Sequence, residues 1–140
     1  MSKKIFLDAN ILVDLMDEQR PQHQAAKRIV IECLRLGDDL FTSCDIVTTL
    51  YYLSAKSDKK RALNEIAKIN TFCKVIEFSN VEVAQTCTLM SEDENFLDLE
   101  DTIQYVLAKK YECDVIITND QQFHSPDIAL YTSKSFLELL

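Results

Sequence analysis

The sequence predicts one α/β domain over residues 1–140, with three layers (α/β/α) around a central, mostly parallel sheet of five strands. Short apolar segments alternate with segments whose apolar residues recur at helical spacing, which is typical of a parallel sheet covered by helices. The strand segments are apolar without alternation, as expected for strands buried on both faces. No linker rich in proline, glycine or serine and no repeat interrupts the chain. One domain therefore accounts for all of it.

The first half of the chain contains two predicted strands and four predicted helices. Ile5, Phe6 and Leu7 form an apolar run that ends at Asp8, which predicts a buried strand. Gly37 follows the second helical segment, where glycine commonly ends a helix. The expected elements are a strand at 5–7, helices at 9–18 and 22–36, a strand at 39–43, and helices at 45–55 and 58–72.

The second half repeats the alternation of strands and helices. Its strongest helix is expected to turn Leu99, Ile103, Val106 and Leu107 inward. The expected elements are a strand at 74–78, a weaker helix at 81–90, an acidic stretch at 92–94, a helix at 99–111, strands at 114–118 and 129–131, and a closing helix at 134–140.

The composition excludes several classes of protein. No apolar run approaches the roughly 20 residues of a membrane span, and the N-terminus does not resemble a signal peptide, so a cytoplasmic protein without membrane contact is expected. The single glycine, Gly37, cannot supply a glycine-rich phosphate or dinucleotide loop. Five cysteines without a CxxC pair predict reduced, mostly buried thiols rather than a zinc site. His23 and His124 are expected at the surface.

The formal net charge of -8 is unusual for a protein that binds nucleic acid, because such proteins usually present a basic face. The one local concentration of cations is Lys56, Lys59, Lys60 and Arg61, whose spacing suits a solvated turn between helices. Any contact with a phosphate backbone would therefore need bound cations to offset the repulsion.

Acidic and polar side chains stand where two predicted strands end. Asp8 closes the first strand, with Asn10 two residues later, and the fourth strand ends in Thr118, Asn119 and Asp120. Ligands of open α/β sheets bind at the carboxyl ends of the strands. If the two strands are neighbours, the sequence predicts an acidic pocket there.

The helix before the fourth strand adds further carboxylates. Asp98 and Asp101 are three residues apart and share a face, whereas Leu99, Ile103 and Val106 turn the other way. Clustered carboxylates raise one another's pKa unless cations neutralise them. Hard divalent ions with oxygen ligands, Mg²⁺ or Mn²⁺, suit such a cluster.

Other interpretations of these acids stay open from the residues alone. Asp8, Asp120 and Asp98 each precede a helical segment, where aspartate is a favoured N-cap. A phosphoacceptor receiver domain would have a paired acid at the first strand and a lysine after the last, and a DxD-type phosphatase would have an aspartate in place of Asn10. Neither pattern is present, and no Ser/His/Asp or Cys/His set is convincing.

The two ends of the chain resemble the signatures of PIN domains. FLDANILVDL resembles the opening strand, its aspartate and the small polar residue two positions on. DLEDTIQYVLAKKYECDVIITNDQQF resembles the C-terminal signature, and TSCDIVTTLYYL and ALYTSKSFLELL look like the second strand with its helix and the last strand with its helix. The resemblance covers the chain in order.

This resemblance implies a site and an activity. Asp8, Asp101 and Asp120 match the acids that bind Mg²⁺ or Mn²⁺ and carry catalysis in PIN nucleases. The polar residues expected to orient them, or to lie beside them, are Asn10, Asp98, Thr118 and Asn119. The implied activity is hydrolysis of RNA phosphodiesters by a metal-dependent endoribonuclease, with Tyr51, Tyr52 and residues 56–61 as possible contributors to RNA preference.

One position departs from the family pattern. Many PIN nucleases have a glutamate in the helix after the second strand, where this chain has Thr49, and Asp45 lies nearer the start of that helix. The expected carboxylate count falls to three, or four with Asp98. A catalytically weakened PIN fold that binds RNA or protein is therefore the alternative to the enzyme.

Many small PIN proteins are VapC-like toxins that dimerise and are inhibited by an antitoxin. The resemblance therefore implies a toxin of a toxin–antitoxin pair, a homodimer formed through the helices around residues 51–66, and an antitoxin protein as partner.

Overall fold

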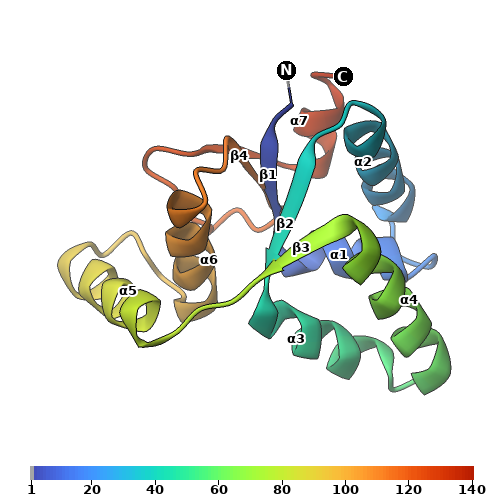
Figure 1. The fold of residues 1–140 in the computed structure, drawn as a ribbon, viewed down its shortest axis with the longest axis horizontal. Helices are drawn as coiled ribbons and strands as arrows, with labels where there is room; N and C mark the ends of the chain where they lie inside the picture. Colours follow the sequence, from blue (N-terminus) through green and yellow to red (C-terminus); the bar gives the residue numbers. More distant parts are fainter. Residues whose placement is uncertain (1) are drawn as a thin grey trace.

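The structure, a computed structural model, describes residues 2–140 and contains one sheet of five parallel strands (Figure 1). The strand order is β3-β2-β1-β4-β5, so β1 lies at the centre, between β2 and β4. The predicted α/β fold is confirmed, and every strand pairing is parallel. The strands are β1 (Lys4–Leu7), β2 (Asp39–Ser43), β3 (Cys73–Ile76), β4 (Val115–Ile117) and β5 (Ala129–Tyr131).

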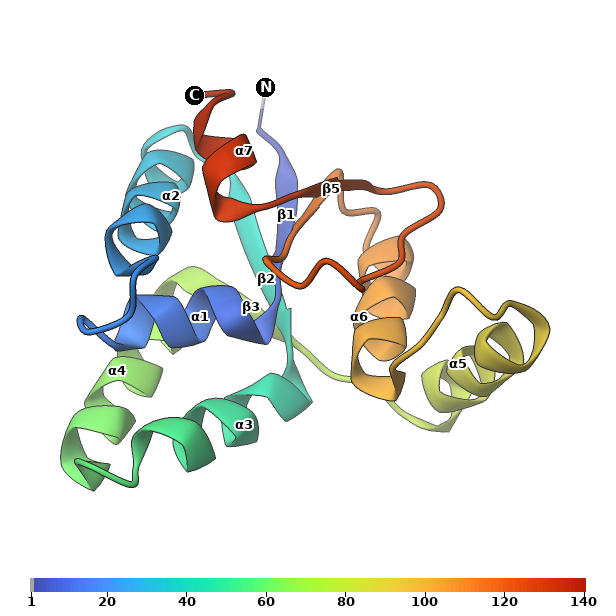
Figure 2. The same cartoon turned by 180° about the vertical axis from the view of Figure 1, so that it is seen from behind.

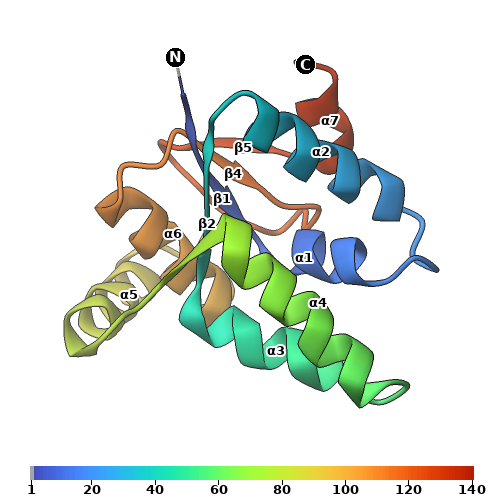
Figure 3. The same ribbon diagram turned by 45° about the vertical axis from the view of Figure 1, so that its right-hand side comes forward.

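Helices cover both faces of this sheet. Helices α5 and α6 pack together on one side, and α1, α2 and α7 lie on the other, while α3 and α4 pair beside β2 and β3 (Figure 3). The three-layer arrangement is thus confirmed. The helices are α1 (Ala9–Met16), α2 (His23–Arg35), α3 (Cys44–Ser54), α4 (Lys59–Phe72), α5 (Asn80–Glu92), α6 (Leu99–Lys110) and α7 (Ser133–Leu137).

The central strands form the core because both of their faces are covered. Ile5, Phe6 and Leu7 are fully buried, and Phe6 pairs with Phe41 of β2 and Ile116 of β4. Successive side chains of a strand point to opposite faces of the sheet. Because helices cover both faces, the buried run of β1 is apolar without alternation. The sheet is therefore a rigid platform for the residues that follow its strands.

Helix α6 differs from the amphipathic helix that the sequence predicts. All residues from 102 to 108 are buried, including the polar Thr102 and Gln104, whereas Leu99 is 53% exposed. The expectation that Leu99 faces inward is wrong, because Leu99 is the first residue of the helix and projects beyond the layer that covers later turns. Ile103, Val106 and Leu107 face inward as predicted, but the expected separation of polar and apolar faces is wrong, since residues 102–108 are buried on every side of the helix.

Smaller differences lie at element ends and at the histidines. Strand β3 begins at Cys73, one residue earlier than predicted, and the last helix ends at Leu137 rather than at residue 140. His124 is half-buried with its ring edge against Phe96, and His23 is half-buried with Nδ1 2.9 Å from the Asp14 carbonyl oxygen, so neither is a freely exposed surface residue. Gly37 follows α2 at a φ of 78°, as its position predicts.

The five thiols are free, and three of them, Cys33, Cys73 and Cys113, are buried. Among residues 2–140, no helix combines the length and the apolar character that crossing a membrane would need.

Candidate metal centre

The polar side chains predicted at the strand ends come together because β1 and β4 are neighbours. Leu7 pairs with Ile117, so the chain leaves both strands at the same edge of the sheet. Figure 2 shows that the start of α1, the start of α3 and the first turn of α6 meet at this edge, beside the loop between β4 and β5. Four segments far apart in the sequence thus supply side chains to one region.

Asp8 is the buried centre of this region, with 3% of its surface exposed. Its Oδ1 accepts a hydrogen bond from the backbone N–H of Ala9 at 2.6 Å. Its Oδ2 accepts hydrogen bonds from the Thr118 hydroxyl at 2.7 Å and from Asn10 Nδ2 at 2.9 Å. Asp8 therefore caps α1, as an N-cap would, but it is also held by side chains from both strand ends. Capping alone does not explain its surroundings.

The pKa of Asp8 reflects two opposed effects. Burial raises the pKa of this carboxyl above its usual value, and the charge of Asp120 adds to the rise. The Thr118 hydroxyl, the Ala9 amide and the neighbouring Gln104 side chain act in the opposite direction. The hydrogen bonds thus favour the charged form without fully compensating for its removal from water.

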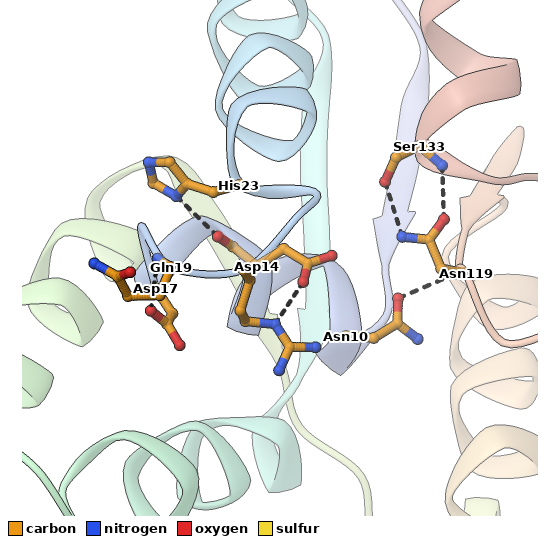
Figure 4. Close-up of polar contacts among 8 residues, drawn as sticks. Asn10, Asp14, Asp17, Gln19, His23, Asn119 and Ser133 are labelled. Atoms are coloured by element: carbon orange, nitrogen blue, oxygen red, sulfur yellow. Dashed lines mark hydrogen bonds and ion pairs between the residues drawn. The ribbon is translucent and has the colours of Figure 1, made fainter.

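A second set of hydrogen bonds fixes the polar residues predicted to orient Asp8. Asn10 Oδ1 accepts from the backbone N–H of Asn119 at 3.1 Å. The Asn119 side chain in turn accepts from the Ser133 N–H at 2.9 Å and donates to the Ser133 hydroxyl at 3.0 Å (Figure 4). The starts of α1 and α7 are therefore tied together through the loop that follows β4.

Asp120 lies beside this network but in contact with solvent. Its backbone N–H donates to the Thr118 hydroxyl oxygen at 3.1 Å, and its Oδ1 accepts from the backbone N–H of Gln122 at 2.9 Å. The interpretation of Asp120 as a helix cap is wrong, because a turn and not a helix follows it. Its exposed carboxylate is available to a ligand.

The first turn of α6 brings three more carboxylates. Asp98 is the N-cap, with its Oδ2 accepting from the backbone N–H of Asp101 at 3.0 Å. Burial raises the pKa of Asp101 to about 7, and the charges of Asp8, Asp98, Asp120 and Glu100 add to this rise. Asp101 therefore shares an electrostatic environment with both strand-end acids, as the sequence predicts.

Two acids that the sequence interpretation left out also belong to this region. Burial raises the pKa of Glu100, and the charges of Asp45, Asp8 and Asp98 add to the effect. Asp45, in the first turn of α3, accepts a hydrogen bond from the Ser43 hydroxyl. The acids that share this environment thus number six, and whether Glu100 or Asp45 takes the place of the acid missing at Thr49 stays a prediction.

These two acids could have been found from their positions. Glu100 directly precedes Asp101, and Asp45 follows the end of β2 by two residues, close behind a strand as Asn10 is behind β1. We call the six residues together the acidic cluster: Asp8, Asp45, Asp98, Glu100, Asp101 and Asp120.

The donor chemistry of the acidic cluster fits a hard divalent ion. None of the six carboxylates forms an ion pair with a cation of residues 2–140. All the ligand atoms are oxygens, which Mg²⁺ and Mn²⁺ prefer. Within the same residues, no three acidic, histidine or cysteine side chains are already drawn together around one point. The carboxylates of the acidic cluster repel one another in the absence of a cation. Binding of an ion would have to bring them closer together.

Another buried acid of α1 has a different role. Asp14 is 4% exposed and accepts a hydrogen bond from Arg20 Nε at 2.6 Å (Figure 4). The half-buried His23 lies against the carbonyl of the same residue. Asp14 is therefore neutralised within the protein and stabilises the turn between α1 and α2.

The residues suggested for RNA preference lie away from the acidic cluster. Tyr51 and Tyr52 follow Asp45 by six and seven residues on α3, which places them about 10 Å further along the helix. The cations of residues 56–61 lie beyond them, in the turn to α4 and its first residues (Figure 2). They could contact only a substrate that extends well past the acids.

Comparisons with known proteins show the family to which the chain is similar. A family model described as PIN domain matches residues 5–129. The chain is 44% identical over 137 residues to a protein named Ribonuclease VapC1 from Aquifex aeolicus, and the match covers 98% of this chain and 95% of that one.

Solved structures share the fold at low sequence identity. VapBC2 from Rickettsia felis, bound to a promoter DNA fragment, matches with a TM-score of 0.72 and 16% identity over 92% of this chain and 98% of that chain. DNA-bound VapBC from Salmonella typhimurium gives a TM-score of 0.70 and 18% identity, over 95% and 99% of the two chains. VapC20 from Mycobacterium tuberculosis, a Sarcin-Ricin loop cleaving toxin, gives 0.68 and 19%, over 85% and 92%. The chain belongs to the PIN-domain family.

Proposed function

We propose that this protein is a Mg²⁺- or Mn²⁺-dependent endoribonuclease that hydrolyses RNA phosphodiesters, a VapC-like toxin. The observation that carries the proposal is the buried Asp8, held by the ends of β1 and β4 and surrounded by carboxylates that no cation of residues 2–140 neutralises. The 44% identity to a protein named as a ribonuclease supports the reaction class.

The residues of the acidic cluster have distinct roles in this proposal. Asp8, Asp101 and Asp120 hold the ion, and Asn10 and Thr118 keep the Asp8 carboxylate oriented through the hydrogen bonds described above. When bound, a divalent ion supplies an activated water and neutralises charge that develops on the phosphate.

The neighbouring residues support the metal centre. Asp98 fixes the first turn of α6 by capping it, and Asn119 holds the loop after β4 through Ser133. Glu100 and Asp45 add negative charge on the α3 side, where a second ion or a proton could be accepted.

The net charge of -8 makes RNA binding depend on cations. A phosphate backbone is repelled by an unoccupied acidic cluster, and divalent ions reverse the local sign. The proposal therefore predicts that RNA affinity, and not only cleavage, requires Mn²⁺ or Mg²⁺.

A Mn²⁺ titration tests the proposal. The purified protein is incubated with a labelled RNA pool, with EDTA or increasing Mn²⁺, and the products are mapped. Mn²⁺-dependent internal cleavage is expected, with at least a hundredfold loss in Asp101→Asn. Glu138→Gln is the matched control, since Glu138 is an exposed acid directly after α7, and α7 lies beside the amino end of β1, away from the start of α6 (Figure 1).

The catalytically weakened binding module gives a different result. In that case the protein retains RNA across the titration but leaves it intact, and Asp101→Asn has no effect on products. This outcome would overturn the enzyme proposal and would point to Thr49 as the substitution that matters.

A homodimer formed through α3 and α4 is also part of the proposal. Tyr52, Leu53 and Leu63 are 71%, 55% and 52% exposed on these helices, and large apolar side chains so exposed favour an interface. Sedimentation should show a dimer that Leu63→Glu converts to monomer. A wild-type monomer at all concentrations would contradict it.

An antitoxin partner is proposed because several matching structures are toxin–antitoxin complexes. A small protein encoded next to this chain should copurify with it and suppress Mn²⁺-dependent cleavage. Absence of any such complex on co-expression would count against this part of the proposal.

A further inference from the structure

Gln104 is the exceptional residue of α6. It is fully buried, and neither Nε2 nor Oε1 of its side chain has a hydrogen-bond partner. Among residues 2–140, these are the only buried side-chain nitrogen and oxygen atoms in that condition. Native proteins satisfy nearly all such atoms, so an exception calls for a ligand, an ion or a water.

Gln104 lies next to the acidic cluster. It follows Asp101 by three residues, which places both on one side of the helix. The Gln104 amide faces the Asp8 carboxyl closely enough to lower its pKa as a hydrogen-bonding neighbour does, but the contact does not reach full hydrogen-bond geometry, and Oε1 has no partner. Nε2 of the amide is therefore adjacent to Asp8 without a full hydrogen bond to it, and Oε1 is left without a donor.

The chemistry of an amide limits what can satisfy Gln104. Its Nε2 needs an acceptor, and the carboxylate of Asp8 is one. Its Oε1 needs a donor, but the Thr118 hydroxyl and Asn10 Nδ2 already donate to Asp8. Once a divalent ion is bound, the carboxylates of the acidic cluster are ionised and have no proton to donate. A water of a hydrated cation is a donor that would fit this position.

We propose that Gln104 is a positioning residue of the metal centre, which donates to Asp8 through Nε2 and accepts from a water of the cation's hydration shell through Oε1. This inference rests on the proposed function, because it requires a divalent ion at the acidic cluster. The amide would then hold both a ligand and a water in place. In the metal-free protein Oε1 has no donor, and the contact of Nε2 with Asp8 does not reach full hydrogen-bond geometry.

Binding of Mn²⁺ by calorimetry tests this role. Gln104→Met keeps the length of the side chain and removes both polar atoms. Loss of a residue that hydrogen-bonds to a metal ligand typically lowers metal affinity by about 10–100-fold. We expect Mn²⁺ binding to weaken by that factor. The urea midpoint of the metal-free variant should not fall, since the substitution removes unsatisfied atoms.

Thr86→Val is the matched control. Thr86 is also a fully buried polar residue, but its hydroxyl donates to the Glu82 carbonyl at 2.8 Å within α5. This variant should lower the urea midpoint and leave Mn²⁺ affinity within twofold of wild type. The two variants thus separate a general loss of buried polarity from a loss at the metal centre.

A measurement on the wild-type protein does not depend on any variant folding. In a Mg²⁺ titration followed by NMR, the side-chain NH₂ resonances of Gln104 should shift and exchange more slowly with water, whereas those of the exposed Gln85 should not. Unchanged Gln104 resonances at saturating Mg²⁺, or a Gln104→Met protein that binds Mn²⁺ as wild type does, would overturn the inference alone. A wild-type protein that bound neither ion would overturn the proposed function together with it.

Discussion

Asp101→Asn should stabilise the metal-free protein while removing its response to metal. The Asp101 carboxylate is half-buried among charges of its own sign, and its pKa is raised from 3.8 to about 7. Asparagine has the same shape without the charge. A residue kept for metal binding is thus expected to destabilise the fold when no metal is present.

The magnitude follows from the pKa. At about 1.4 kcal/mol for each tenfold change in proton affinity, the rise from 3.8 to about 7 corresponds to an upper limit of about 4 kcal/mol. Water and salt screen a half-buried carboxylate, so we expect roughly 1–2 kcal/mol. In wild type, the free energy of unfolding is highest with respect to this group below pH 3.8, where Asp101 is protonated. That stability is lost as the pH rises through about 7 and Asp101 becomes charged.

Urea unfolding in EDTA at a series of pH values measures this effect. The free energy of unfolding of Asp101→Asn should exceed that of wild type by about 1–2 kcal/mol at pH 8, and the difference should vanish toward pH 4. Glu138→Gln should show no comparable pH-dependent difference. In Mn²⁺, wild type should gain stability and Asp101→Asn should gain little. If Asp101→Asn were less stable than wild type in EDTA at pH 8, Asp101 would not belong to a repulsive cluster and the reasoning would fail.

Three further substitutions test separate parts of the structure. Thr118→Val removes a hydrogen bond to the buried Asp8 carboxylate and should lower the free energy of unfolding by about 2 kcal/mol, measured in urea, with weaker Mn²⁺ binding by calorimetry. Arg20→Met leaves Asp14 buried without its partner, and because the arginine is 43% exposed the expected loss is only about 1 kcal/mol; an unchanged urea midpoint would contradict it. Gly37→Ala meets no neighbouring atom but must hold a φ of 78°, so it should cost about 1 kcal/mol, checked by thermal unfolding.

The sequence alone determined the order of the elements and the identity of the strand-end acids. Apolar runs and helical spacing are local properties, and they specified β1, β2, β4 and the main helices closely. Asp8 and Thr118 could be chosen as site residues because each directly follows a buried parallel strand, and ligands bind at the carboxyl ends of such strands.

The tertiary structure alone decided which carboxylates share an electrostatic environment and how far each is buried. Asp8 and Thr118 meet across 110 positions of sequence only because β1 pairs with β4. Glu100 and Asp45 join them because α6 and α3 begin at the same edge of the sheet (Figure 2). The burial of Gln104 and the exposure of Leu99 were likewise not readable from helical spacing, since spacing assigns faces to a helix but does not say how many of them the rest of the molecule covers.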